Sequence, residues 1–106
     1  MDQKELVISF IDILNKQDYA KARSLVSEDF SFQSPVISID NPDEYFRQMR
    51  ELKISYDIKK AFSDGDDVCV FYDYTIKGTI RFGCGWYKLK GGKIVSLRIV
   101  SDAPAQ

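Results

Sequence analysis

Hydrophobic residues recur with two different periods along this chain. In residues 3–15 the apolar positions Leu6, Phe10 and Leu14 are spaced four apart, which predicts an amphipathic helix with one buried face. Over residues 54–59 apolar residues alternate with polar ones, a period of two that is typical of a β-strand. The chain is therefore predicted to begin with helices and to continue in strands.

A second helix is predicted over about residues 19–27. Asp18 precedes it and is a favourable N-cap, because its carboxylate can accept from the free amides of the first turn. The inward-facing residues of this helix would be Ala22, Leu25 and Val26.

Asn41 and Pro42 predict the start of a third helix. Asparagine caps the free amides of a first turn, and proline fits its first position. Glu44 can reach back to the cap amide and complete a capping box. The inward stripe of this helix would consist of Tyr45, Met49 and Leu52.

The remaining segments are predicted to be strands. Short strands are expected at residues 30–32 and 36–39. Turns at Asp64-Gly65, Lys77-Gly78 and Gly91-Gly92 then divide an antiparallel meander whose last strand covers residues 94–99. Three helices followed by such a meander predict an α+β fold in which the helices cover one face of the sheet.

A two-residue turn at Lys77-Gly78 fixes the register of the central hairpin. One face, predicted to lie under the helices, would hold Val68, Val70, Tyr72, Tyr74, Arg81, Gly83, Gly85 and Tyr87. Gly83 and Gly85 either let the sheet bend or bulge, or leave a pocket open on this face. A slip of one residue would exchange the two faces.

The other face of the hairpin is also apolar. A single layer of helices would leave it exposed, and an exposed apolar patch is a liability unless it is an interface. We therefore expect a homodimer through the sheets, although strand twist could instead hide these side chains within one chain. The expected interface residues are Phe71, Phe82, Cys84 and Trp86.

Composition narrows the function classes. The 106 residues are expected to form one domain, with residues 103–106 as a loose tail. A net charge of -1 and no basic stripe argue against nucleic acid or a membrane surface as partner. Two cysteines and no apolar run of membrane-spanning length predict a cytoplasmic protein. The chain has no histidine, so a Cys/His zinc site is excluded, and neither a metal nor a cofactor is expected.

Several segments together resemble the nuclear transport factor 2-like superfamily. They are residues 10–15 (FIDILN) with Asp18, residues 25–30 (LVSEDF), residues 34–36 (SPV) and residues 92–98 (GKIVSLR). The pattern is most similar to ketosteroid isomerase and to SnoaL-like polyketide cyclases, over roughly residues 3–101. The resemblance implies a cystatin-like cone, in which a strongly curved, mostly antiparallel sheet wraps a long helix and an apolar pocket lies at the open end.

The catalytic residues of those families do not transfer to this chain. The tyrosine, the aspartate base and the second aspartate of the isomerase fall on or beside Phe10, on Ser34 and on Gly85. The late acid–base residues of the cyclases fall on or near Leu97 and Ile99. None of these side chains can perform the family's proton transfer alone.

Other residues are weaker candidates for a catalytic base or a ligand contact. Asp40 near the pocket rim and Asp73 in mid-strand are candidate bases, but Asp40 also fits an exposed turn and Asp73 faces outward in the predicted register. Arg81 could anchor a ligand anion or simply cover Tyr74. The predicted ligand-binding residues are Phe10, Leu14, Ser34, Met49, Tyr56, Tyr72, Tyr74, Arg81, Tyr87, Leu97 and Ile99.

Three functions fit these residues. We favour a binding protein that holds a small apolar ligand oriented by tyrosine hydroxyls. The alternatives are an isomerase or cyclase with a relocated carboxylate base, acting on a small cyclic or polyketide-like substrate, and a dimeric interaction protein whose cone is filled by its own side chains. A carboxylate facing the cone would favour the enzyme, and an empty cavity would argue against the filled cone.

Overall fold

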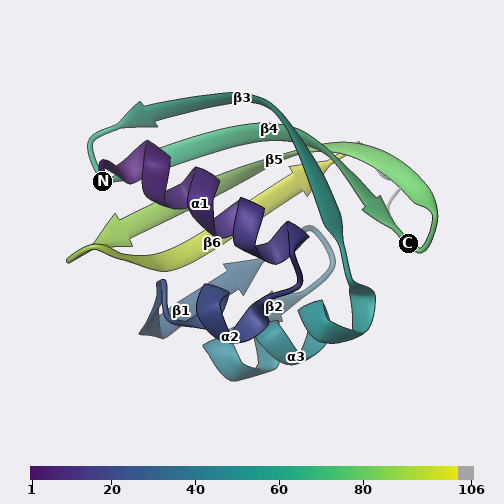
Figure 1. Ribbon diagram of the computed structural model, residues 1–106, viewed down its shortest axis with the longest axis horizontal. Helices are drawn as coiled ribbons and strands as arrows, with labels where there is room; N and C mark the ends of the chain where they lie inside the picture. Colours follow the sequence, from purple (N-terminus) through teal and green to yellow (C-terminus); the bar gives the residue numbers. More distant parts are fainter. Residues whose placement is uncertain (103–106) are drawn as a thin grey trace.

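The computed structural model describes residues 1–102, and it shows an α+β fold with helices packed on one strongly curved sheet (Figure 1). The strand order is β2-β1-β6-β5-β4-β3, and every pairing is antiparallel except that of β1 with β6. The elements are α1 (Gln3–Asn15), α2 (Tyr19–Arg23), β1 (Val26–Gln33), β2 (Ser38–Ile39), α3 (Pro42–Leu52), β3 (Ser55–Asp64), β4 (Asp67–Ile76), β5 (Thr79–Lys90) and β6 (Lys93–Ser101). The tail predicted at 103–106 lies outside the described residues.

α1 lies across the curved strands and forms the centre of the core (Figure 1). Its first turn is closed by a capping box between Asp2 and Glu5. Its last residue, Asn15, exchanges two hydrogen bonds with the backbone of Tyr56, at 2.7 and 2.8 Å. This contact fixes the end of the helix against the start of β3.

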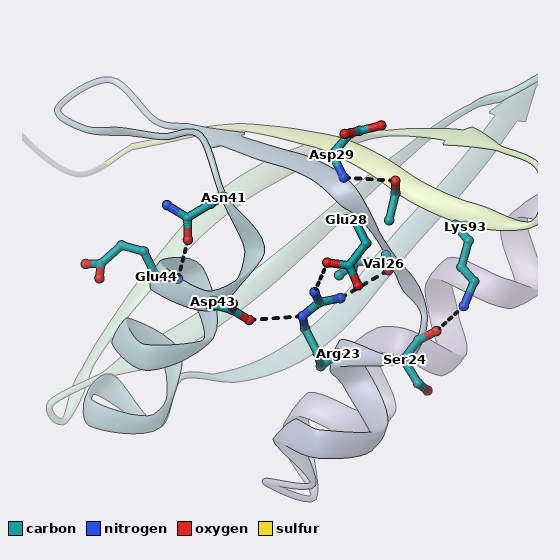
Figure 2. Close-up of polar contacts among 10 residues, drawn as sticks. Arg23, Ser24, Val26, Glu28, Asp29, Asn41, Asp43, Glu44 and Lys93 are labelled. Atoms are coloured by element: carbon teal, nitrogen blue, oxygen red, sulfur yellow. Dashed lines mark hydrogen bonds and ion pairs between the residues drawn. The ribbon is translucent and has the colours of Figure 1, made fainter.

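The second helix is shorter than predicted and ends at Arg23 rather than near residue 27. Val26 belongs to β1, where it lies beside Ile94 of β6. A β-branched residue that can join a sheet gains more there than in a frayed last turn. Figure 2 shows how Arg23 joins the neighbouring elements, with ion pairs to Glu28 in β1 and to Asp43 in α3.

The strand predicted at 36–39 is reduced to Ser38–Ile39. The preceding residues form a turn closed by a 2.8 Å hydrogen bond from the amide of Ser34 to the carbonyl of Ile37. Serine and proline in this segment favour such a turn over a continuous strand.

The register predicted for the β4–β5 hairpin is confirmed throughout, from Asp67 opposite Lys88 to Ile76 opposite Thr79. Lys77 and Gly78 both have positive φ, which matches the right-handed twist of the flanking strands. Val68, Val70, Tyr72 and Tyr87 are buried under the helices as expected. No helix of residues 1–102 is long and apolar enough to cross a membrane.

Candidate functional site

A cavity of about 230 Å³ lies between α3 and the inner face of the sheet. It is bounded by α3, by the turn before β2 and by strands β1, β2, β3, β4 and β6, and its walls are mostly apolar. The lining residues are Phe32, Ser34, Val36, Ile37, Ile39, Tyr45, Gln48, Met49, Leu52, Ile54, Tyr56, Tyr72, Tyr74, Ile76, Leu97 and Ile99.

Much of the predicted ligand-binding set comes together around this cavity. The members that line it are Ser34, Met49, Tyr56, Tyr72, Tyr74, Leu97 and Ile99. They come from α3, β3, β4, β6 and the turn before β2, so no short segment of sequence forms the site.

Four predicted members lie elsewhere. Phe10 is fully buried, and its ring packs edge-on against Phe46 and Tyr87, each with a centroid separation of 6.3 Å. Leu14 and Tyr87 are buried in the same core and do not line the cavity. Arg81 lies opposite Tyr74 in the hairpin but does not line the cavity. Side chains of α1 fill the core at this level, and the cavity lies between α3 and the sheet.

The two glycines of β5 make room for aromatic rings rather than for the cavity. No irregularity interrupts the β4–β5 pairing, so they do not mark a bulge there. A methyl group placed on Gly85 would meet Cε1 of Tyr87 at 2.8 Å and the Tyr72 hydroxyl at 3.2 Å. Two buried tyrosines, Tyr72 and Tyr87, therefore pack directly against the backbone of Gly85.

Three tyrosines form one wall of the cavity. Tyr56 stands opposite Tyr74 in the β3–β4 ladder, and Tyr72 lies two residues away on the same face. Their ring centroids are 5.0 Å (Tyr56–Tyr72), 6.0 Å (Tyr72–Tyr74) and 6.5 Å (Tyr56–Tyr74) apart. Within residues 1–102, none of the three hydroxyls has a hydrogen-bond partner in the protein.

Burial keeps the phenols of Tyr56 and Tyr72 neutral. It raises the pKa of Tyr56 and of Tyr72 above the usual value of 10.0, and the neighbouring tyrosines raise the pKa further. The pKa of Tyr45, on the α3 side of the cavity, is raised for the same reasons. These side chains can donate hydrogen bonds at neutral pH, but they are poorly suited to act as anions.

Ser34 has a local structural role in addition to lining the cavity. Its Oγ accepts from the amides of Ile37, at 3.2 Å, and of Val36, at 3.4 Å. These bonds help to shape the turn that places Val36 and Ile37 at the cavity wall.

The polar side chain that sequence reasoning missed is Gln48. It follows Glu44 by one helical turn, and its Nε2 donates to Oε2 of Glu44 at 2.9 Å. Arg47 also donates to this carboxylate, so Glu44 does not reach back to the cap amide as predicted. Asn41 alone caps α3, through the amide of Glu44 (Figure 2). The four-residue spacing of Glu44 and Gln48 could have indicated this contact from the sequence, because side chains at i and i+4 of a helix are neighbours.

The candidate bases lie outside the cavity. Asp40 is exposed and does not line it. Asp73 is on the opposite face of the sheet, 3.5 Å from the Nζ of Lys59. The cavity walls described here contain no Asp, Glu, Lys or Arg side chain.

A family model, the SnoaL-like domain, matches residues 7–97. The crystal structure of an NTF2-like protein of unknown function from Cytophaga hutchinsonii is similar, with a TM-score of 0.94 and 31% sequence identity, over 96% of this chain and 91% of that chain. A Kribbella flavida protein provisionally named a ketosteroid isomerase has a TM-score of 0.88 and 17% identity, over 98% and 80% of the two chains. An uncharacterized cystatin fold protein from Novosphingobium aromaticivorans has a TM-score of 0.83 and 15% identity, over 93% and 97%. No curated protein matches the sequence.

Proposed function

The chain belongs to the SnoaL-like domain family, and we propose that this member binds a compact, uncharged and largely apolar molecule. The observation that carries the proposal is the cavity of about 230 Å³, whose walls are apolar apart from tyrosines, Ser34 and Gln48. Pockets for drug-sized ligands span ~300–1,000 Å³, so the ligand is smaller than a typical drug.

The alternative of a cone filled by its own side chains is less well supported. Phe10 packs into the core away from the cavity, and Met49 and Tyr72 line the empty volume without closing it. An apolar cavity costs stability, which a chain without a ligand would gain by filling it. This cost favours a role for the space.

The alternative of an enzyme with a relocated base is also less well supported. A general base must come within hydrogen-bonding reach of the proton that it removes. Asp73 is separated from the cavity by the sheet, and its nearest charged partner is Lys59. We expect Asp73→Asn to leave ligand affinity unchanged. A catalytic turnover that this substitution abolishes would contradict that expectation.

Binding can be tested by filling the cavity from one wall. Ile99 lines the cavity, whereas Val100, the next residue of β6, is 57% exposed and pairs with Cys84 on the other face. Ile99→Trp should weaken binding of compact neutral aromatic probes at least ~tenfold, because the indole occupies their space. The probes would be titrated while the methyl resonance of Met49 is followed.

Val100→Trp is the matched control, since it adds the same indole one residue away on the opposite face. Circular dichroism would show that both variants remain folded. The proposal predicts binding by the wild type and by Val100→Trp, with loss only in Ile99→Trp. Equal binding by all three proteins, or no binding by the wild type, would contradict it.

A further inference from the structure

The polar groups of the cavity are divided between two opposing walls. The β3–β4 wall contains Tyr56, Tyr72 and Tyr74, the α3 wall contains Gln48 beside Tyr45, and Ser34 lies in the turn before β2. The hydroxyls of the β3–β4 wall have no partner within the described residues, so their protons remain available to a ligand. A phenol can both donate and accept, and a ligand acceptor such as a carbonyl oxygen satisfies its proton.

Gln48 offers the opposite polarity because its amide has only one workable orientation. The Glu44 carboxylate can only accept, so the NH₂ group of Gln48 must face it, as the 2.9 Å contact shows. Arg47 donates to the same carboxylate from two nitrogens and holds it in place. The carbonyl oxygen of Gln48 is left without a partner among residues 1–102. It is therefore free to accept from a donor on a ligand.

Charge further restricts the ligand. A carboxylate or phosphate in this cavity would lose its hydration and meet no cationic side chain, since no Lys or Arg lines the walls. An ammonium group would likewise meet no carboxylate. The walls accommodate neutral groups only.

We propose that the ligand carries both a carbonyl group and a hydroxyl group on a compact neutral frame. The carbonyl accepts from the tyrosines of the β3–β4 wall, and the hydroxyl donates to Oε1 of Gln48. Glu44 acts as a positioning residue, because it fixes which end of the Gln48 amide is free. This inference rests on the binding function proposed above and specifies its ligand class as a neutral hydroxy-ketone.

The experiment compares five aromatic probes of similar size. They are para-hydroxyacetophenone, which has both groups, acetophenone, para-ethylphenol, ethylbenzene and the anion para-hydroxybenzoate. Dissociation constants come from titrations that follow the Met49 methyl resonance. The wild type should bind para-hydroxyacetophenone about tenfold more tightly than acetophenone, the gain expected of one hydrogen bond, and should reject the anion.

Two variants test whether Gln48 accepts a hydrogen bond from the hydroxyl group of the ligand. Gln48→Met keeps the length and helix propensity of the side chain but removes the oxygen, so the roughly tenfold preference for the hydroxylated ketone should disappear while the affinity for acetophenone is kept. Glu44→Gln should reduce the same preference, because the amide of Gln48 can then turn around. A change in overall stability alone would shift the affinities for both ketones and leave their ratio unchanged.

A second pair of variants tests whether the tyrosines of the β3–β4 wall donate to the carbonyl group of the ligand. Tyr72→Phe should weaken both ketones and leave ethylbenzene unaffected. Tyr19→Phe removes a hydroxyl that is buried outside the cavity, and it should change no affinity. A ratio near one in the wild type, or a preference that survives Gln48→Met, would overturn the ligand class while binding itself stands. Failure of every probe, ethylbenzene included, to bind would instead overturn the binding function.

Discussion

The hydroxyl oxygen of Tyr72 lies over Gly85 of the neighbouring strand, where a methyl group would stand only 3.2 Å from it. The same methyl would stand 2.8 Å from Cε1 of Tyr87 and 3.2 Å from Cδ1 of Leu97. Gly85→Ala should therefore destabilise the protein by about 1–3 kcal/mol through overpacking. It should also displace Tyr72 and Leu97 at the cavity wall. Urea unfolding and the Leu97 methyl resonances would measure the two effects.

Gly78→Ala is the control for this substitution. An added methyl meets nothing within 4 Å, but φ is +79°, so the cost of roughly 1–2 kcal/mol is conformational only. This variant should leave the Leu97 resonances unchanged. Equal shifts in both variants would show that Gly85 has no special place under the tyrosines.

The hydroxyl of Tyr19 is buried without a hydrogen-bond partner among the described residues. Burial raises the pKa of Tyr19, and the charge of Arg50 opposes this in part. Because the folded protein leaves a polar group unsatisfied, Tyr19→Phe should stabilise it by about 1 kcal/mol. The midpoint of urea unfolding measures this. Tyr74→Phe, which removes a hydroxyl that is accessible in the cavity, should give no such gain.

The sequence predicted the hairpin better than the site, for physical reasons. Register follows from a local turn, so Lys77-Gly78 placed Tyr72 and Tyr74 on the inner face correctly. The position of the cavity within the cone depends on how α1 and α3 pack against the sheet. Phe10 was therefore assigned to a pocket that its own ring and Phe46 fill. Gln48 was missed because the orientation of its side-chain amide depends on a hydrogen bond to Glu44, which the sequence pattern does not show.

The carboxylate of Glu44 should make stability depend on pH in acid. Hydrogen bonds from Arg47 and then Gln48 lower the pKa of Glu44 from 4.5 to about 2. A lowered folded-state pKa means that the stabilisation is complete above pH 4.5 and is lost as the pH falls towards 2. The stability difference between the wild type and Glu44→Gln should therefore shrink across this window. Chemical denaturation at a series of pH values measures the difference.

Arg47→Met tests the cause of this pH dependence. Without the guanidinium, the pKa of Glu44 should return towards 4.5, and the window should move to higher pH. The side-chain amide resonances of Gln48 report the titration directly, because Nε2 donates to this carboxylate. A window unchanged in Arg47→Met would exclude the ion pair as its cause.

The outer face of the sheet bears an aromatic patch that one copy of the chain does not cover. Phe71 and Phe82 stack there with centroids 6.3 Å apart and planes at 17°. Phe82 is 45% exposed and Trp86 is 41% exposed, although the indole is anchored by a 2.8 Å hydrogen bond to Asp67. Such a patch is the surface expected of an interface. We propose that a second copy covers it, because a twofold axis brings the same patch onto itself.

Trp86→Glu tests this arrangement, because each copy would then bury an unpaired carboxylate in the proposed interface. We expect the wild type to sediment as a dimer and Trp86→Glu as a monomer. Val36→Glu introduces the same charge at a residue that is 68% exposed in the turn before β2, and it should remain dimeric. A Trp86→Glu protein that stays dimeric would move the interface away from this face. A wild type that is monomeric at every concentration would leave the patch without its proposed partner.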